Sequence, residues 1–344
     1  MSTWHSILET QQISIDEQGY SRSSAPVNPA LSITPLTHLG LFSVIGPDAE
    51  KFLQGQISCD MRDISNGFSR LASHNNVKGS MISLSRVMPA EGGYWLRTNR
   101  QILSNALTAL NKYMLFSKAD GTDISDTVVG LGIQGSDAAS ALAALSNELP
   151  AETDQFLSLD GGVLIKVAGE RYELWLEQAQ AETALDLLIQ TGSLNGSENW
   201  LLSEIQQGIP SLTPDTLETF IPQMTNLQAF EGVSFRKGCY TGQEIITRLQ
   251  HRGKLKRPMF RLSVQADTAP AAGTVLATAT RASVGNVVCS ALSGEGEYQL
   301  LAVMLKDVFD DGSQSVHLDT QEGPQLERLD LPYTLDPEMF EAKR

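Results

Sequence analysis

The chain has 344 residues and a net charge of −15, with 41% hydrophobic and 19% charged residues. Its length predicts two or three domains, and its composition is that of a globular protein rather than a disordered or fibrous one. No apolar run approaches the roughly 18 residues that span a bilayer, and the acidity of the chain disfavours non-specific binding to nucleic-acid backbones.

The first residues, MSTWHSILETQQ, contain neither the basic nor the apolar segment of a secretory signal peptide. The three cysteines, Cys59, Cys239 and Cys289, are far apart in the sequence and include no CxxC pair. This pattern predicts a reducing, cytoplasmic compartment, without disulfides or a metal site. We expect a monomer that does not associate with membranes.

Apolar periodicity predicts an α+β region over residues 1–254. The first 30 residues show no clear period and are predicted to be irregular. After them, apolar or alternating runs that favour strands are interspersed with three- and four-residue spacings that favour helices. Strands are predicted within 39–45, 81–88, 93–98, 127–135, 162–169 and 171–177, and helices within 49–57, 103–114, 137–149, 179–192 and 197–208.

The last part of the chain has a different pattern. Five short strands at regular spacing, separated by Gly, Asp and Ser turns, are predicted between residues 259 and 319. Such a series without a helical period indicates a small barrel or sandwich. We place the domain boundary near residues 253–258, which gives domains 1–254 and 255–344.

The segment FRKGCYTGQE, residues 235–244, contains the most unusual thiol of the chain. Phe235 is predicted to end a strand, and TGQEIITRL to begin a helix. Gly238 and Gly242 permit tight backbone and the close approach of a ligand. Cys239 would therefore lie beside a helix N-terminus.

Arg236 and Lys237 precede this thiol in the sequence. Because cations and a helix N-terminus both favour thiolate, we expect a lowered pKa and nucleophilic or redox sensitivity for Cys239. The alternative is a buried cysteine that packs as a small hydrophobe, which is the interpretation for Cys59 and Cys289 in their apolar contexts.

The same stretch begins a basic region within the acidic chain. Residues 236–261 hold eight Lys or Arg residues and a single acid, Glu244. A local positive patch attracts a small anion more than a long polyanion. The alternative interpretation is a solvated charged surface.

Residues 220–253, FIPQMTNLQAFEGVSFRKGCYTGQEIITRLQHRG, closely resemble the YgfZ family of folate-binding proteins. Weaker similarity covers SVIGPDAEKFLQGQIS (43–58), HNNVKGSM (74–81), ENWLLSEIQQGIP (198–210) and LPYTLDPE (331–338). The resemblance implies the fold of the glycine-cleavage aminomethyltransferase (T-protein). That fold is a three-domain ring of two interleaved α+β domains, one ferredoxin-like, followed by a C-terminal antiparallel β-barrel.

The resemblance also implies a binding site for tetrahydrofolate or a derivative. A pterin needs a stacking face and ring-edge hydrogen bonds, and its glutamate tail needs cations. Trp200 matches a tryptophan associated with folate in the family, although a core role is the alternative. Gln206 stands where the family more often has a carboxylate, and Leu39 where it has a second tryptophan. Asn226 is a ring-edge candidate or a turn residue.

The remaining candidates come from the motif itself and the helix after it. We expect Lys237, Arg248 and Arg252 to bind the tail carboxylates, with Tyr240 beside them. The catalytic aspartate of the T-protein corresponds to about Leu84 here, in a stretch (77–88) without Asp or Glu. Aminomethyltransferase activity is therefore not expected.

The resemblance implies an accessory protein that supports iron–sulfur enzymes, and through them the thiolation or methylthiolation of tRNA, with Cys239 as the functional thiol. The implied partners are folate and iron–sulfur enzymes or their assembly proteins, with weak or no direct tRNA contact. Two alternatives remain open: a folate-dependent one-carbon transferase with an unknown acceptor, and a tRNA-binding scaffold.

Overall fold

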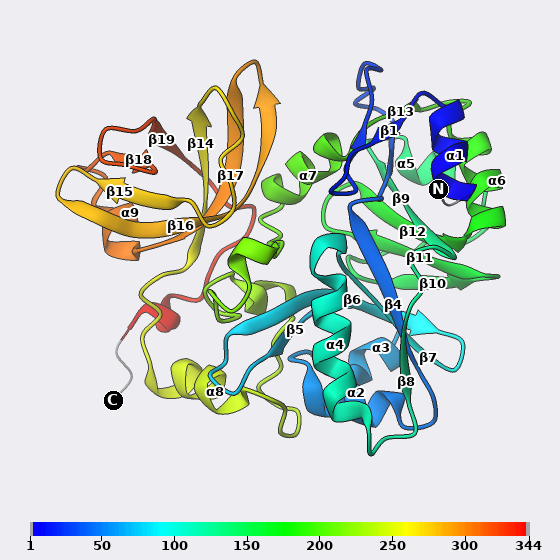
Figure 1. The fold of residues 1–344 in the computed structure, drawn as a ribbon, viewed down its shortest axis with the longest axis horizontal. Helices are drawn as coiled ribbons and strands as arrows, with labels where there is room; N and C mark the ends of the chain where they lie inside the picture. Colours follow the sequence, from blue (N-terminus) through cyan, green and yellow to red (C-terminus); the bar gives the residue numbers. More distant parts are fainter. Residues whose placement is uncertain (1–2, 342–344) are drawn as a thin grey trace. The chain divides into compact units, whose positions relative to one another are not determined.

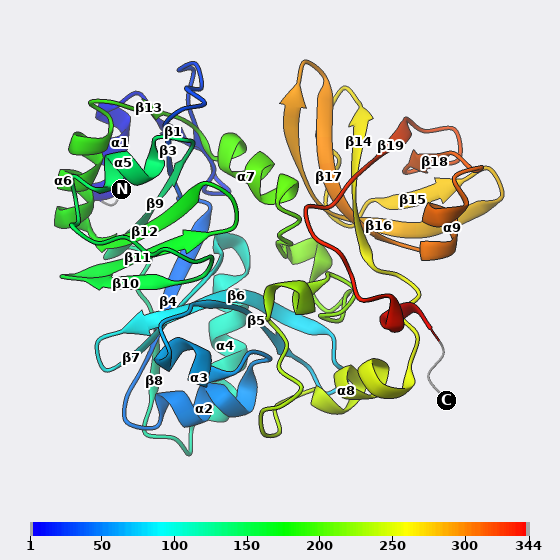
Figure 2. The same cartoon turned by 180° about the vertical axis from the view of Figure 1, so that it is seen from behind.

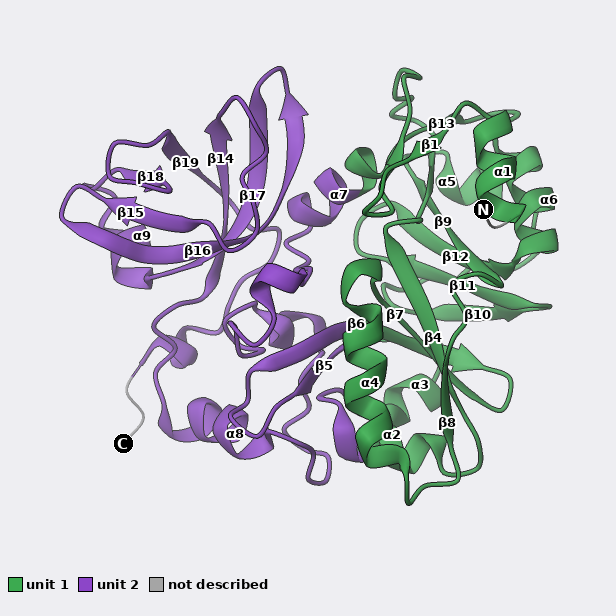
Figure 3. Ribbon diagram, viewed as in Figure 1, with its two compact units in different colours: residues 1–54, 60–70, 85–200 green, residues 55–59, 71–84, 201–344 purple. Residues whose placement is uncertain are grey.

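A computed structural model describes residues 3–341, which form two compact units (Figure 3). Unit 1 comprises residues 1–54, 60–70 and 85–200, and unit 2 comprises residues 55–59, 71–84 and 201–344. The chain therefore passes between the two units several times. The predicted boundary after residue 254 stays a prediction.

Unit 1 contains a six-stranded sheet with helices on one face (Figure 1). Its strand order is β10-β11-β12-β9-β3-β13, antiparallel except for the parallel pair β3–β13. The strands are β3 (Ser32–Pro35), β9 (Val128–Gln134), β10 (Phe156–Leu159), β11 (Gly162–Val167), β12 (Arg171–Glu177) and β13 (Ser193–Leu194). Helices α1 (Thr3–Thr10), α5 (Ala138–Leu142) and α6 (Gln178–Leu188) contribute buried residues to the core on this face.

Side chains of this sheet alternate between two apolar cores, because successive residues of a strand point to opposite faces. On β12, Leu174 packs into the core under the helices and Trp175 into the core on the other face. On β9 the second face carries Gly130 and Gly132. A Cβ at either glycine would lie under 3 Å from an indole ring, that of Trp175 or Trp200. The glycines therefore make room for two tryptophans.

A five-stranded antiparallel sheet has the order β5-β6-β7-β4-β8. Its strands are β4 (Leu39–Ile45), β5 (Arg70–Asn75), β6 (Met81–Ala90), β7 (Gly93–Asn99) and β8 (Asp120–Asp123). In unit 1, α4 (Leu103–Met114) packs on β8 and β4, and α2 (Ala49–Gln56) and α3 (Met61–Ser65) follow β4 along the chain. Residues 71–84, from β5 through the turn into β6, belong to unit 2.

The N-terminal segment differs from the sequence-based expectation. The described part of residues 1–30 is not irregular throughout: α1 is followed by the short pair β1 (Ser14–Ile15) and β2 (Ser21–Arg22). Trp4 and Leu8, one helical turn apart, are buried in the core beneath α1. Ile7 packs against the same core, so three apolar residues define one side of an eight-residue helix, which spans little more than two turns.

Unit 2 contains the end of α7 (Ser197–Gln206), α8 (Gln243–Arg252) and a closed six-stranded barrel (Figure 2). The barrel order is β14-β17-β16-β15-β18-β19, and β19 pairs with β14 to close it. Its strands are β14 (Met259–Gln265), β15 (Val275–Thr278), β16 (Arg281–Gly294), β17 (Glu297–Met304), β18 (Val316–Leu318) and β19 (Gln325–Leu329). The predicted α+β fold with a C-terminal antiparallel β-barrel is confirmed.

Two barrel elements were not expected from the sequence. Strand β19, QLERL, has a single buried residue, Leu326, and therefore lacks an apolar pattern. Helix α9 (Lys306–Asp311) is mostly charged and contributes one fully buried residue, Val308, to the barrel core. Within residues 3–341, no helix has both the length and the apolar character needed to cross a bilayer.

Candidate functional site

The segment from Phe235 to Thr241 has no regular secondary structure, and α8 begins directly after Gly242. Phe235 does not end a strand, so that prediction is wrong; its ring contacts His251 edge-on, with centroids 6.2 Å apart. The prediction of a helix within TGQEIITRL is confirmed. We call residues 235–242 the thiol loop.

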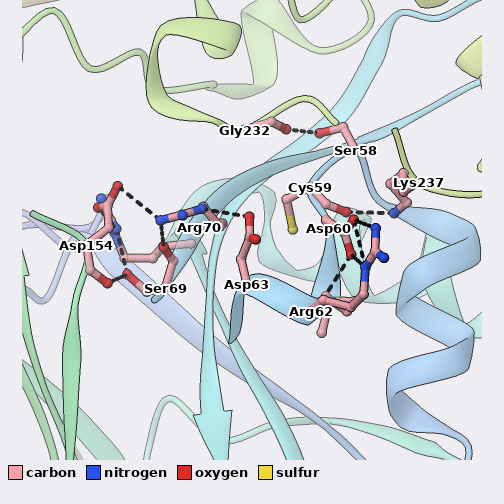
Figure 4. A network of polar contacts seen from close by, with 12 residues as sticks. Ser58, Cys59, Asp60, Arg62, Asp63, Ser69, Arg70, Asp154, Gly232 and Lys237 are labelled. Atoms are coloured by element: carbon pink, nitrogen blue, oxygen red, sulfur yellow. Dashed lines mark hydrogen bonds and ion pairs between the residues drawn. The ribbon is translucent and has the colours of Figure 1, made fainter. Parts of the chain in front are cut away.

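Lys237 anchors the thiol loop to another segment of unit 2 (Figure 4). Its Nζ donates hydrogen bonds to the carbonyl oxygens of Ile57 (2.8 Å) and Cys59 (2.6 Å). The side chain is only 8% exposed, and its ammonium lies 5.1 Å from the ring centroid of Tyr240. Hydrogen bonds to a charged donor are among the stronger ones and offset the desolvation of the ammonium. Lys237 therefore fixes the backbone on one side of Cys239.

Gly242 fixes the other side of the loop. Its φ of 81° lies in the left-handed region, and a Cβ there would be 2.5 Å from the carbonyl oxygen of Asn76. The adjacent turn of the β5–β6 hairpin also contacts α8, since a Cβ at Gly79 would lie 3.1 Å from that of Ile245. Gly238, by contrast, has open space around its Cβ position. Only Gly242 therefore has the tight environment that was expected of both glycines.

The three cysteines are free and differ in exposure. Cys239 is exposed on the thiol loop, and Cys59 is fully buried, as expected for a small core residue. Cys289 lies half-buried on β16, where burial raises the pKa of its thiol to about 12. Cys239 is thus the most exposed of the three thiols and the one most accessible to a second molecule.

The candidate cations near the thiol loop lie at the surface. Arg236, Arg248 and Arg252 are all exposed. Arg248 and Arg252 are four residues apart on α8, so they project from the same side of the helix. Two planar guanidinium groups at this spacing suit the carboxylates of a glutamate tail. Their role in ligand binding stays a prediction.

Two polar candidates contribute to the packing of unit 2. The Asn226 side chain is buried, donates from Nδ2 to the carbonyl oxygen of Met259 (2.8 Å), and accepts from the Met259 N–H (3.3 Å). Its φ of 57° agrees with the turn interpretation. The backbone carbonyl oxygen of Gln206, rather than its side chain, accepts a hydrogen bond from the Arg261 guanidinium at 3.0 Å. Asn226 and Gln206 thus hold β14, and no observation assigns them a ligand.

Trp200, the last residue of unit 1, lies in the core. It is fully buried, its ring lies over Gly132, and the Arg171 guanidinium carbon is 4.0 Å from the ring centroid. This packing agrees with the alternative of a core tryptophan. Leu39, at the position of a second family tryptophan, belongs to the same apolar cluster.

A buried charge cluster lies on the same face of the unit 1 sheet. Arg86 and Arg97 are directly opposite one another on β6 and β7, and their like charges would repel each other if no acid lay nearby. Glu173 forms ion pairs with both and accepts a hydrogen bond from Trp175. Although burial raises the pKa of Glu173, the charges of Arg97 and Arg86 lower it to about 2. Asp154 also pairs with Arg86, at 2.5 Å.

The charge network continues to the start of β5, where Figure 4 shows Asp154, Ser69, Arg70 and Asp63 in turn. Arg70 donates to Asp63 at 3.0 Å and lies 4.0 Å from Asp154. The sequence analysis missed this cluster. The available signal was the alternation of RYELWLE, which places Arg171 and Glu173 on the same face as Trp175. Within residues 3–341, no group of three or more His, Cys, Asp or Glu is placed to hold a metal ion.

Comparison with known proteins supports the sequence resemblance. Residues 14–230 match the GCVT N-terminal domain family. The tRNA-modifying protein YgfZ of Klebsiella pneumoniae (strain 342) is 35% identical over 311 residues, which cover 89% of this chain and 94% of that protein. Its counterpart in Photobacterium profundum is 32% identical over 314 residues, 90% of this chain and 93% of that protein.

A solved structure shows the same fold. The glycine cleavage system aminomethyltransferase T of Bartonella henselae superposes with a TM-score of 0.66 over 90% of this chain and 87% of that one. The sequences are 18% identical, so this likeness concerns the fold alone. The predicted T-protein-like fold is confirmed. The length and coverage of the matches to the curated relatives, together with the domain match, show that the chain belongs to the YgfZ family.

Proposed function

We propose that this protein is a folate-binding accessory protein that supports the assembly or repair of iron–sulfur enzymes, and thereby the modification of tRNA, with Cys239 as its functional thiol. The observation that carries the proposal is an exposed thiol on a loop held at both sides. The relatives named tRNA-modifying proteins supply the process in which it acts.

The thiol loop favours chemistry with a large partner. A thiolate is both a nucleophile and a ligand for iron, and it must be accessible to act on a protein-bound centre. Lys237 and Gly242 immobilise the backbone around Cys239, so presenting the sulfur to a partner requires little further ordering of the loop.

Unit 2 offers donor groups of the kinds that a folate needs. Arg248 and Arg252 offer exposed guanidinium groups for the carboxylate tail. The hydroxyl of Tyr240 is buried and, within residues 3–341, has no hydrogen-bond partner. Burial raises its pKa far above the usual value, so it stays a donor at neutral pH. A bound tetrahydrofolate would supply a carrier of one-carbon units.

The T-protein reaction itself is not part of the proposal. Leu84, close to where the resemblance implies the catalytic aspartate, is 6% exposed on β6, and its side chain has no group that could accept a proton. The chain therefore keeps the fold of the aminomethyltransferase without that catalytic acid.

The thiol is tested in cells that lack the natural protein, by measuring the methylthiolation of tRNA after complementation with Cys239→Ser. We expect the modified fraction to fall to that of the empty vector. Cys289→Ala is the matched control, because its half-buried thiol is not part of the proposal, and it should restore modification. Full methylthiolation in Cys239→Ser, at equal protein level, would contradict the role of Cys239.

The folate is tested by calorimetric titration with tetrahydrofolate. Lys237 and Trp200 are poor test positions, because both are buried and their loss disturbs packing. Arg248→Ala and Arg252→Ala remove exposed groups, and we expect each to weaken binding about three- to tenfold, with a steeper loss at low salt. Arg281 is an exposed arginine on the barrel, and the Arg281→Ala variant should bind tetrahydrofolate as the wild type does. Absence of binding to the wild-type protein would refute the folate proposal.

A further inference from the structure

Asn75, the last residue of β5, has an unusual environment. Its side chain is fully buried within unit 2. Within the described chain, neither Oδ1 nor Nδ2 has a hydrogen-bond partner. A buried amide without partners costs about 1–3 kcal/mol, so such a group calls for a ligand or an ordered water.

The neighbouring groups place Asn75 at the thiol loop. A Cβ on Gly242 would lie 3.0 Å from the Asn75 Cβ, so the end of the loop covers this residue directly. Figures 1 and 2 both show α8 beside the tip of the β5–β6 hairpin. Ser73, two residues earlier and hence on the same face of β5, has a buried hydroxyl that also lacks a partner within residues 3–341. Asn75, whose amide atoms have no hydrogen-bond partner within the described residues, thus lies against the helical end of the thiol loop.

We propose that the Asn75 amide binds the ring edge of the pterin, accepting from a ring N–H with Oδ1 and donating to the ring carbonyl with Nδ2. This inference rests on the proposed folate binding and adds the residue that recognises the heterocycle. An amide is the side chain that supplies one donor and one acceptor side by side, which matches the lactam edge of a pterin. The carboxylates of a glutamate tail, which only accept, cannot use both groups.

The position of Gly242 links folate binding to the thiol loop. Because Gly242 lies against Asn75, a pterin that reaches the amide displaces the helical end of the thiol loop, while the Lys237 anchor on the other side of Cys239 stays in place. Folate binding should therefore change the environment of Cys239, and the two functions of the loop are coupled. The coupling arises because the folate would bind the protein with the loop end displaced more tightly than the protein with the loop end in place.

The test compares the wild-type protein with Asn75→Leu and Asn75→Asp by calorimetric titration. Leu removes both hydrogen-bonding groups at similar size, and Asp replaces the donor by an acceptor. We expect both variants to bind tetrahydrofolate at least about tenfold more weakly. The fragment p-aminobenzoylglutamate, which lacks the pterin, should bind all three proteins equally.

Two further measurements separate the outcomes. The urea midpoint of Asn75→Leu without ligand should equal or exceed that of the wild type, because an unsatisfied amide is replaced by an apolar group. The rate of N-ethylmaleimide labelling at Cys239 should change with tetrahydrofolate in the wild type and not in the variants. If both variants bind tetrahydrofolate as tightly as the wild type does, the proposed role of Asn75 is wrong. Its amide would then bind ordered water alone, and the proposed folate binding would remain intact. Failure of the wild type itself to bind would refute both.

Discussion

Units 1 and 2 each bury cationic side chains, and they hold them in different ways. In unit 1, Glu173 lies between Arg86 and Arg97 and neutralises part of their charge. In unit 2, Lys237 donates to the uncharged carbonyl oxygens of residues 57 and 59. The first arrangement joins strands into a core. The second fixes the position of a loop, and these contacts do not cancel the positive charge beside Cys239.

The largest effect should come from breaking the cluster in unit 1. Glu173→Gln leaves two buried guanidinium groups without their shared acid, and we expect it to lower the free energy of unfolding by about 3–5 kcal/mol. Urea denaturation followed by circular dichroism measures this loss. Glu198→Gln is the matched control: Glu198 pairs with Arg22 at the surface, and its loss should cost under about 1 kcal/mol. Equal losses for both would contradict the comparison.

The same cluster predicts a pH dependence. The pKa of Glu173 is lowered in the folded state to about 2, below its ordinary 4.5. Its contribution to stability is therefore present above pH 4.5 and is lost as the pH falls from there toward 2. The stability difference between wild type and Glu173→Gln should shrink over this window in urea titrations at successive pH values. A difference that stays constant from pH 5 to pH 3 would show that the ion pairs are not its source.

Gly242 tests how tightly the thiol loop is held. Gly242→Ala forces a side chain into the left-handed region and within 2.5 Å of the Asn76 carbonyl oxygen, so we expect a loss of about 2–3 kcal/mol. Gly238→Ala meets open space and should stay within about 0.5 kcal/mol of the wild type. Chemical denaturation of the pair gives both values, and a neutral Gly242→Ala would mean that the loop is not constrained at its helical end.

A substitution at Lys237 tests whether its hydrogen bonds to the carbonyl oxygens of residues 57 and 59 hold the thiol loop. Lys237→Met keeps the length of the side chain but leaves the carbonyls of residues 57 and 59 without its ammonium, with an expected loss of about 1–3 kcal/mol. Lys254→Met, at an exposed position outside the loop, should have almost no effect. In addition, proteolysis within residues 235–242 should become faster only in the Lys237 variant. An unchanged cleavage rate would remove Lys237 as the anchor of the loop.

The smallest effect on stability should come from substituting Cys239, the proposed functional thiol. Cys239→Ser changes an exposed side chain and should shift the free energy of unfolding by no more than about 0.5 kcal/mol. Cys59→Ser places a hydroxyl in a fully buried position and should cost about 1–3 kcal/mol. Labelling of the folded wild type with N-ethylmaleimide, followed by mass spectrometry, should modify Cys239 before the other two thiols. Faster labelling of Cys59 would contradict the exposure of the loop.

Much of the fold followed from the sequence because its elements are long or regular. The alternation in β11 and β12 and the three- and four-residue spacing in α4 are local signals, and each predicted an element that the structure contains. Helix α1 and strand β19 were missed because each contains only one or two buried residues. Phe235 was placed at a strand end because an apolar residue before a turn resembles one.

The candidate site was less predictable than the fold. Trp200 and Asn226 were weighed as ligand contacts or packing residues, and the structure shows their packing: one lies over Gly132, and the other holds Met259. Asn75 could not be singled out, because the sequence of a polar turn does not show which amide is buried. Cys239, in contrast, was singled out by its basic and glycine-rich neighbours, and the structure shows it exposed on the loop.

The sequence by itself determined the family, the α+β class with a terminal barrel, and the segment that presents a thiol. These properties are encoded locally, in periodicity and in one contiguous motif. Only the tertiary structure decided which cations are buried in the core, which glycine has no room for a side chain, and which buried amide has no hydrogen-bond partner. Those outcomes depend on segments far apart in the chain, where burial and hydrogen-bond partners arise only once the strands have paired.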